Sequence, residues 1–342
     1  MTKAFRDFLK RLKNDPKGWV FFKLFIAILL LCAFLPFLVN ESPLLIRYQG
    51  KFYAPMTTAY TERDFGGILP VKVDFHEARI RQRIENEGWI IWSIIPHSSW
   101  SVDYSLKNSG PHKPSKQHWL GTDTHGRDLL ARLLYALRFT LFFSLLLTTL
   151  SSVLGFCIGA VQGYFGGRVD MVLQRFVEIW FSVPVLFLLI ALASLVSLTF
   201  STMLLVLTLF KWRSIVPLVR MLFLRARESP YVEAAKALGV SKRSIVFKHI
   251  LPNVIFAPLA RIPFMVMAGV SILTTLDFFG FSLPFPMLTF GEILVQGKNN
   301  LHAPWIVCGA IGFLLSVLLV LIFLGESFQK IFLFKKRSGE CS

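Results

Sequence analysis

Long apolar blocks separated by polar stretches dominate the pattern of this chain of 342 residues. Each block has 20 residues or more, which at a rise of about 1.5 Å per residue is enough to cross a hydrocarbon core about 30 Å thick. The pattern therefore predicts an all-α, polytopic membrane protein with six spanning helices. The blocks cover approximately residues 19–39, 133–161, 172–196, 202–222, 254–276 and 305–324.

One long polar segment, residues 40–132, separates the first block from the other five. It contains 12 basic and 10 acidic residues, with prolines and glycines throughout, so it cannot span a membrane. Loops of this length cross the membrane largely regardless of their charge. We therefore expect this segment to form a small ordered cap on the outer side.

Composition and charge narrow the class of protein. The chain is 54% hydrophobic and only 17% charged, whereas soluble domains carry about 25% charged residues, so an ordinary soluble domain is excluded. The net charge of +17 would suit nucleic-acid binding if it formed a basic face on a soluble surface. Here the basic residues lie between apolar blocks, which indicates contact with membrane lipid and not with nucleic acid.

The distribution of basic residues predicts the orientation. Residues 1–18 carry six basic residues, the turn at 162–171 one, the segment at 225–249 six and the tail four, whereas the connections at 197–201 and 277–304 carry none and one. Because Lys and Arg are concentrated in short cytoplasmic loops, both termini are expected in the cytoplasm. The predicted organisation is a cytoplasmic N-terminus (1–18), a first spanning helix (19–39), an outer segment (40–132), a five-helix core (133–324) with a cytoplasmic loop (225–253), and a cytoplasmic tail (325–342).

The cytoplasmic loop reads as two short helices around a glycine. Ser229-Pro230 is typical of a helix start, and Gly239 stands where a left-handed C-terminal residue is expected. Ser241 predicts the cap of a second helix over residues 242–251, which Pro252 would end. In the first helix one apolar face is predicted from the spacing of Tyr231, Ala234, Ala235 and Leu238.

The spacing of residues in this loop allows two interpretations. It could lie on anionic lipid as an amphipathic linker, because Lys and Arg are attracted to such a surface. Alternatively it could dock into a protein groove, because Ala234, Ala235 and Gly239 offer little apolar area for insertion but permit close backbone approach. The small residues favour docking.

A family resemblance supports docking. Glu233-Ala234-Ala235, followed by Gly239 and then by His249 before Leu251-Pro252, resembles the EAA loop of ABC-importer permeases. Four further stretches resemble segments of dipeptide and oligopeptide permeases of the C type. They are LGTDTHGRDLLARLLYALRFTLFFSL, GYFGGRVD, LDFFGFSLP and GEILVQGKNNLHAPW. The outer segment is similar to one branch of these permeases in particular, the YejE branch, which is associated with uptake of peptides and of the peptide-nucleotide microcin C. The stretches that carry this similarity are PLLIRYQGKFYAP, DFGG and GWIIW.

This resemblance implies a type I ABC-importer permease of the bacterial inner membrane that works by alternating access. The implied partners are a second permease in a heterodimer, ABC ATPase subunits, and a periplasmic peptide-binding protein. ATP and Mg²⁺ would be bound by the ATPase, so this chain would be no enzyme and would bind no cofactor itself. The residues implied in coupling to the ATPase are Glu233, Ala234, Ala235, Gly239 and His249.

No catalytic or metal-binding motif is visible in the sequence. Gly291 and Gly297-Lys298 only superficially suggest a phosphate-binding loop, because five residues separate the glycines and Asn299 stands where Ser or Thr is required. The four cysteines and seven histidines lack the spacing of a metal site, so no metal is predicted. The cysteines are expected to be packing residues, and His76, His97, His112 and His118 to be polar residues of the outer segment.

Charged residues inside the apolar blocks are costly and need an explanation. Arg175 and Glu178 are three residues apart, so they are expected to neutralise each other on one helix face. Lys211 and Arg213 could line a polar pathway or could extend from a helix that ends early. Arg261 lies about seven residues into its block, so its side chain could extend to the inner membrane interface. This interpretation is favoured over a role of Arg261 in translocation. These three basic residues depart from the resembled family.

Two other classes of function fit the sequence less well. A proton-coupled secondary transporter would use the intramembrane charges, but it predicts inverted repeats, and the two halves of this sequence show none. A membrane-anchored enzyme would need a catalytic constellation in residues 40–132, and none is visible there. The proton-coupled class also gives no role to the EAA-like loop.

Overall fold

The computed structural model describes residues 10–68, 70–103, 106, 110–193, 199–281, 283–284 and 286–338, and only the backbone of residues 186, 190, 192, 193 and 332–338. The predicted cytoplasmic ends, the connection at 197–201 and Cys341 therefore lie wholly or partly outside the described residues. The chain divides into two compact units. Unit 1 contains residues 1–27, 139–292 and 314–342, and unit 2 contains residues 28–138 and 293–313.

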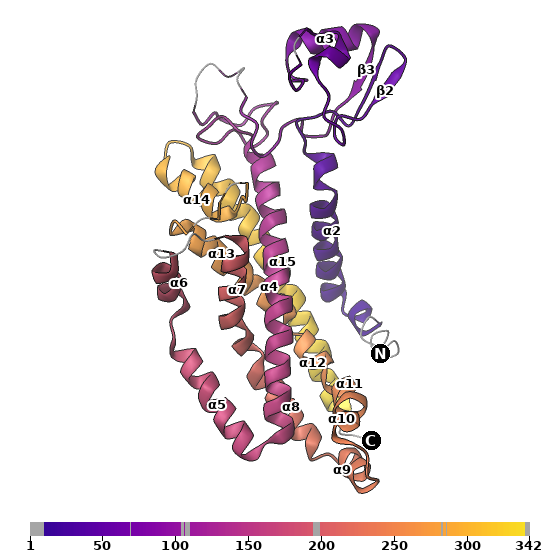
Figure 1. Ribbon diagram of the computed structural model, residues 1–342, viewed down its shortest axis with the longest axis vertical. Helices are drawn as coiled ribbons and strands as arrows, with labels where there is room; N and C mark the ends of the chain where they lie inside the picture. The colour runs from indigo at the N-terminus through magenta and orange to yellow at the C-terminus, as the bar shows by residue number, and fades with distance from the viewer. Residues whose placement is uncertain are drawn as a thin grey trace. The chain divides into compact units, whose positions relative to one another are not determined.

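Most of the described chain is helical (Figure 1). The longer helices are α2 (Pro16–Leu38), α4 (Leu129–Phe165), α5 (Gly167–Ser182), α7 (Phe200–Lys211), α8 (Val216–Arg227), α13 (Ile262–Phe278) and α15 (Pro304–Ser338). The shorter ones are α3 (Ala78–Glu87), α6 (Val185–Ala193), α9 (Pro230–Ala237), α10 (Lys242–Ser244), α11 (Leu251–Val254), α12 (Phe256–Leu259) and α14 (Phe290–Asn299). Short 3₁₀-helices occupy Glu62–Phe65 (η1) and Trp212–Ser214 (η2), and a π-helix occupies Ile245–Ile250 (η3).

The number of uninterrupted spanning helices is smaller than the six apolar blocks suggest. Within the described ranges, Pro16–Leu38, Leu129–Phe165 and Pro304–Ile331 are long and apolar enough to cross a membrane, and a fourth span results if Phe200–Ser214 and Val216–Arg227, bent by 42°, count as one. Residues 172–196 were expected as one helix, but α5 ends before Pro184 and α6 begins after it. Proline lacks the N–H that would continue the hydrogen-bond ladder.

The block at 254–276 is also interrupted, because α12 ends at Leu259 and α13 begins at Ile262. Pro258 lies in the first piece and Pro263 in the first turn of the second. Arg261 is the residue that precedes α13, so it lies at a helix end and not inside a continuous span. The apolar block was correctly located, but its prolines divide it.

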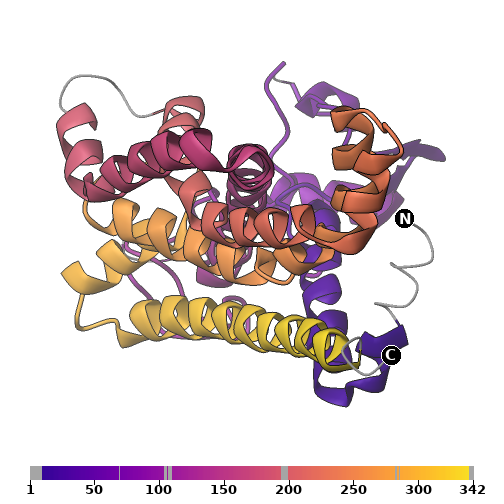
Figure 2. The same cartoon turned by 90° about the horizontal axis from the view of Figure 1, so that it is seen from below.

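In unit 1, α4 and α8 pack with their backbones in close contact (Figures 1 and 2). Gly155, Gly159 and Gly163 form a stripe on α4 with a four-residue spacing. A Cβ atom at Gly155 would lie 2.2 Å from the carbonyl oxygen of Trp212, and one at Gly163 would lie 2.5 Å from that of Arg220. Only glycine permits this approach, which is a common way for membrane helices to associate.

The loop expected at residues 277–304 contains helix α14, whose N-terminal end is fixed by Asp277. The buried carboxylate of Asp277 accepts hydrogen bonds from the Thr289 hydroxyl and from the Glu292 backbone N–H, the latter at 2.9 Å. A carboxylate at a helix N-terminus stabilises the positive end of the helix dipole. Gly291 and Gly297-Lys298 are therefore helical, which agrees with the conclusion that they form no phosphate-binding loop.

Unit 2 contains the folded part of the outer segment, and it corrects the all-α expectation. Strands β1 (Leu45–Tyr48), β2 (Lys51–Tyr53) and β3 (Gly88–Ile91) form an antiparallel sheet in the order β2-β1-β3, with Ile46 opposite both Tyr53 and Ile90. Gln49 and Gly50 have φ angles of 47° and 77°, as a two-residue hairpin turn requires. The sheet and α3 share one apolar core made of Ile46, Tyr48, Phe65, Val73, Phe75, Ile80 and Ile84.

The GTDTHGRD stretch forms a buried ionic turn at the start of α4 in unit 2. Asp123 is fully buried and pairs with Arg127 at 2.8 Å and with Arg132 at 3.3 Å. The guanidinium groups of both arginines lie just over 5 Å from the ring centre of Trp100, at 5.3 and 5.2 Å. These contacts therefore stabilise the turn that precedes α4, because buried charges need paired partners.

Candidate functional site

Helix α9 begins and ends at the residues that the sequence signals. Ser229 precedes it with extended backbone angles, and Pro230 occupies the first turn. At the other end Gly239 has a φ angle of 73°. The N–H of Val240 donates to the carbonyl of Ala235 at 3.1 Å, and the N–H of Gly239 donates to that of Lys236 at 3.0 Å. This pair of bonds is the Schellman arrangement, so the predicted left-handed C-terminal glycine is confirmed.

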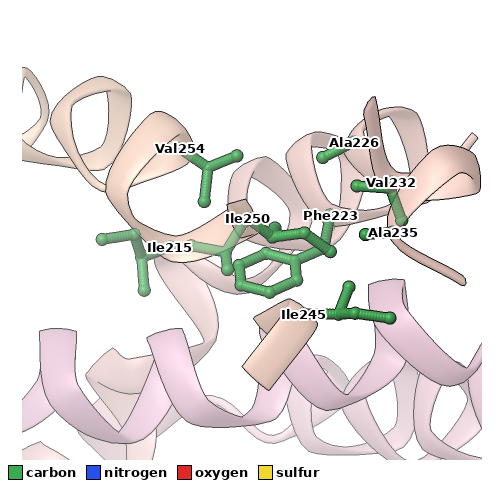
Figure 3. Packing of buried hydrophobic residues seen from close by; sticks show 9 residues of the cluster. Ile215, Phe223, Ala226, Val232, Ala235, Ile245, Ile250 and Val254 are labelled. Atoms are coloured by element: carbon green, nitrogen blue, oxygen red, sulfur yellow. The ribbon is translucent and has the colours of Figure 1, made fainter. Parts of the chain in front are cut away.

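One face of α9 is buried against its own chain (Figure 3). Val232 and Ala235 contribute to a cluster with Phe223 and Ala226 of α8 and with Ile245 and Ile250 of η3. Ile215, Val219 and Val254 complete this cluster. The burial of these side chains fixes α9 to the end of α8, and the whole segment turns back there (Figure 2).

The opposite face of α9 is exposed. Leu238 has 83% of its surface exposed, and Tyr231 and Ala234 are also exposed. The predicted apolar face of Tyr231, Ala234, Ala235 and Leu238 is therefore wrong in one member, because Ala235 belongs to the buried face with Val232. The reason is that α8 and η3 cover α9 from one side, which the periodicity of α9 alone does not reveal.

The remaining coupling candidates are Glu233, Gly239 and His249, and they differ in their surroundings. Glu233 is exposed in the first turn of α9. Gly239 has no atom within 4 Å of an added Cβ, so its requirement is the backbone angle and not packing inside this chain. His249 is half-buried in η3, where its carbonyl accepts a hydrogen bond from Asn253 at 2.8 Å.

The second helix of the loop differs from its predicted form. Ser241 accepts a hydrogen bond from the N–H of Ser244 at 3.4 Å, which confirms it as a cap. The helix then continues as the π-helix η3 and as α11, so Pro252 does not end it. Pro252 stands in the first turn of α11, where its missing N–H is tolerated. Single π turns are frequent at functional sites.

The charged residues of the apolar blocks fall into separate groups. Arg175 and Glu178 form the predicted ion pair at 2.8 Å on the surface of α5. Arg213 donates to the Trp180 carbonyl at 2.8 Å and lies 4.3 Å from the ring centre of Phe181. Arg213 therefore connects η2 to the C-terminal end of α5.

Lys211 and Arg261 line one cavity of about 190 Å³ in unit 1. Thr148 and Ser151 of α4 and Ser214 also line it, with Leu147, Phe264, Met265 and Ala268 as apolar neighbours. Within the described part of the chain, the buried hydroxyls of Thr148 and Ser151 have no hydrogen-bond partner. These two hydroxyls were not singled out from the sequence. The signal was present, because Thr140, Ser144, Thr148 and Ser151 recur every three or four residues along an otherwise apolar helix.

Comparison with known proteins identifies the family. Residues 155–338 match the family described as binding-protein-dependent transport system inner membrane component. The chain is 45% identical over 326 residues to the inner membrane ABC transporter permease protein YejE of Escherichia coli, covering 94% of each chain. It is 38% identical over 345 residues to the peptidoglycan transport system permease protein YejE of Agrobacterium fabrum, covering 94% and 90%.

A more distant relative is the oligopeptide transport system permease protein OppC of Bacillus subtilis, which is 28% identical over 228 residues that cover 66% of this chain and 75% of the relative. The family match covers more than half of the chain, and it includes α9, the cluster beneath it, and Lys211 and Arg261 of the cavity. The chain therefore belongs to the binding-protein-dependent transport system inner membrane components, the permease family of ABC transporters.

Proposed function

We propose that this chain forms, together with a second permease, the membrane pathway of an ABC importer for peptides, and that α9 couples this pathway to an ATPase. The observation that carries the proposal is the division of α9 into a buried face and an exposed apolar face. A fixed helix with an exposed apolar face suits docking in a groove of another protein. The relatives named for oligopeptide and peptidoglycan transport support a peptide or a peptide-bearing compound as the substrate.

The contacts inside unit 1 provide a continuous route from α9 to the spanning helices. Val232 and Ala235 pack on α8, and α8 contacts α4 along the glycine stripe. Packed side chains and close helix contacts move together because protein interiors are dense. A displacement of α9 by the ATPase is thereby passed to α8 and α4, as alternating access requires.

Each coupling residue receives a role from its position. Tyr231, Ala234 and Leu238 form the docking face, and Glu233 adds a charge beside it. Ala235 holds α9 in place from below. Gly239 supplies the turn after α9, and the open space around it leaves room for the partner. His249 acts indirectly, through the η3 turn.

Lys211 and Arg261 are the pathway charges in this proposal. They face one cavity together with two buried hydroxyls, and no carboxylate is among the described residues that line it. Such a cavity suits an anionic group, and a peptide supplies one at its C-terminal carboxylate. Arg175, Glu178 and Arg213 have partners within the chain, so we assign them structural roles.

The remaining assignments rest on the distribution of charge. Both termini and α9 lie on the cytoplasmic side, six apolar blocks cross the inner membrane with three of them broken, and residues 40–132 form a periplasmic cap. ATP and Mg²⁺ are bound by the ATPase, and a periplasmic binding protein delivers the peptide. A proton-coupled secondary transporter finds no support among the relatives.

Purification of the detergent-solubilised chain from its own cells tests the proposal. We expect an ATPase pair and a second permease to co-purify with it, and ATP together with the binding protein to drive uptake of labelled short peptides into vesicles. A peptide-nucleotide conjugate and a peptidoglycan-derived peptide, compared in the same assay, identify the preferred substrate. A chain that purifies alone and moves peptide in response to a proton gradient would contradict the proposal.

A further inference from the structure

Three histidines that are far apart in the sequence stack on one another in unit 2. The rings of His76 and His97 have centroids 5.8 Å apart and an interplanar angle of 5°. The rings of His97 and His118 have centroids 4.7 Å apart. They come from the turn before α3, from the stretch after β3 and from the loop before α4. No short motif joins them, so the sequence predicts no site here.

His118 is the centre of this cluster. Its side chain is only 2% exposed, and its Nδ1 lies 2.8 Å from Oδ2 of Asp128, which is also 2% exposed. Its Nε2 lies 3.2 Å from Oδ2 of Asp103. The other carboxylate oxygen of Asp128 accepts the N–H of Ala131 at 2.7 Å, in the first turn of α4. The carboxylate is therefore held rigidly by the helix start.

The structure assigns a transition-metal site, which we propose to be a Zn²⁺ site, to His97, His118 and Asp128. One ligand atom from each of these residues lies within 4.8 Å of the other two. The ligands of a single zinc ion, with bonds of about 2.0–2.2 Å, lie within about 4 Å of one another. Nδ1 of His118 and Oδ2 of Asp128, which are 2.8 Å apart, therefore need to separate slightly, and the most distant ligand atoms need to approach by roughly one ångström. Two imidazoles and a carboxylate are a common zinc donor set, and three protein ligands leave one position for water.

The surroundings of the site fit this assignment. Asp103 contacts the ring nitrogen of His118 that faces away from Asp128, and ligand histidines are commonly oriented by a carboxylate in this way. The proton that His118 and Asp128 share without metal is released when the metal takes its place.

A bound metal would connect the loop before α4 and the stretch after β3 to the first turn of α4. This function lies beyond transport itself and does not depend on the identity of the substrate or of the ATPase. His118 hydrogen-bonded to two carboxylates could alternatively remain protonated as a purely structural ion pair. Metal binding distinguishes these two states.

The test uses the full-length chain in detergent, carrying an affinity tag without histidine and stripped with a chelator. Equilibrium dialysis against Zn²⁺, followed by elemental analysis, is expected to give about one tightly bound zinc per chain. Titration with Co²⁺ is expected to produce the visible absorption of a four-coordinate site. If the wild-type chain binds no zinc above the level of a protein-free control, the assignment is overturned, whatever the variants do.

Variants locate the metal. His97→Asn removes one ligand but leaves the bonds of His118 to Asp103 and Asp128 in place, so it should lose the zinc and still elute as a monodisperse peak. The matched control His302→Asn alters an exposed histidine and should keep the zinc. Asp103→Asn should bind zinc about 10–100-fold more weakly at unchanged stoichiometry. Zinc retained by His97→Asn at wild-type affinity would overturn the assignment.

Discussion

Asp170 at the start of α5 and Arg220 in the middle of α8 are joined by a two-pronged ion pair. The guanidinium Nε lies 2.5 Å from Oδ1, and Nη2 lies 2.6 Å from Oδ2. Both side chains are largely shielded from solvent. A carboxylate and a guanidinium paired in this way form strong, directional hydrogen bonds. The contact therefore fixes the GYFGGRVD turn against α8, the helix that leads to α9.

Replacing Asp170 with Asn is expected to destabilise the protein by about 1.5–3 kcal/mol, because Arg220 keeps its charge but loses its ionic partner. The measurement is the thermal unfolding midpoint of the purified chain in detergent. Arg175→Gln serves as the control, because it breaks the exposed pair with Glu178, for which a much smaller decrease of the midpoint is expected. Equal effects of the two variants would contradict the importance of the Asp170 contact.

Gly155→Ala tests the close contact of α4 with η2, the turn that leads into α8. The added methyl group would lie 2.2 Å from the carbonyl oxygen of Trp212, so the helices must separate. Overpacking of this kind costs about 1–3 kcal/mol, which should appear as a lower unfolding midpoint and slower uptake. Gly312→Ala adds the same methyl group to a helix where nothing lies within 4 Å, and it should leave both measurements unchanged.

Leu238→Lys tests the docking face of α9. A charged side chain in an apolar groove is costly, so the variant should lose co-purification of the ATPase while the permease remains in the membrane. Leu301→Lys is a matched control, because Leu301 is 80% exposed, compared with 83% for Leu238. Normal recovery of the ATPase with Leu238→Lys would remove α9 as the docking element.

Two substitutions of Gly239 distinguish between two possible requirements at this position: a left-handed backbone conformation, and free space for a partner protein. Gly239→Val should abolish ATP-driven uptake with normal membrane levels, because a β-branched residue strongly disfavours the φ of 73°. Gly239→Asn tolerates that angle and should retain most of the uptake if conformation alone is required. Loss of uptake in both variants, at normal protein levels, would instead indicate that the ATPase approaches closely at this position.

Lys211→Met tests the cavity that Lys211 shares with Arg261. We expect uptake of peptides with a free C-terminal carboxylate to fall about tenfold, which corresponds to about 1.4 kcal/mol. Uptake of the same peptides as C-terminal amides should change much less. The fold of the variant is checked by its elution profile, and an equal loss for acid and amide peptides would contradict carboxylate binding by Lys211.

Local signals in the sequence were sufficient for several features. The apolar blocks located the helices, Ser229 and Gly239 located the ends of α9, and the three-residue spacing of Arg175 and Glu178 predicted their ion pair. These predictions succeed because helix ends and neighbouring turns are governed by residues within a few positions of one another. The prolines that break two of the blocks, Pro184 in one and Pro258 and Pro263 in the other, carry an equally local signal.

The rest depended on tertiary structure, because it joins residues that no short-range rule connects. Which face of α9 is buried was decided by α8 and η3, so Ala235 lies inside although its spacing grouped it with Leu238. Lys211 and Arg261 meet in one cavity although 50 positions separate them. His97, His118 and Asp128 likewise converge only after the segment before α4 has folded. The apolar pattern of this sequence establishes a membrane protein and its helices, whereas its candidate sites arise from long-range packing, which periodicity does not encode.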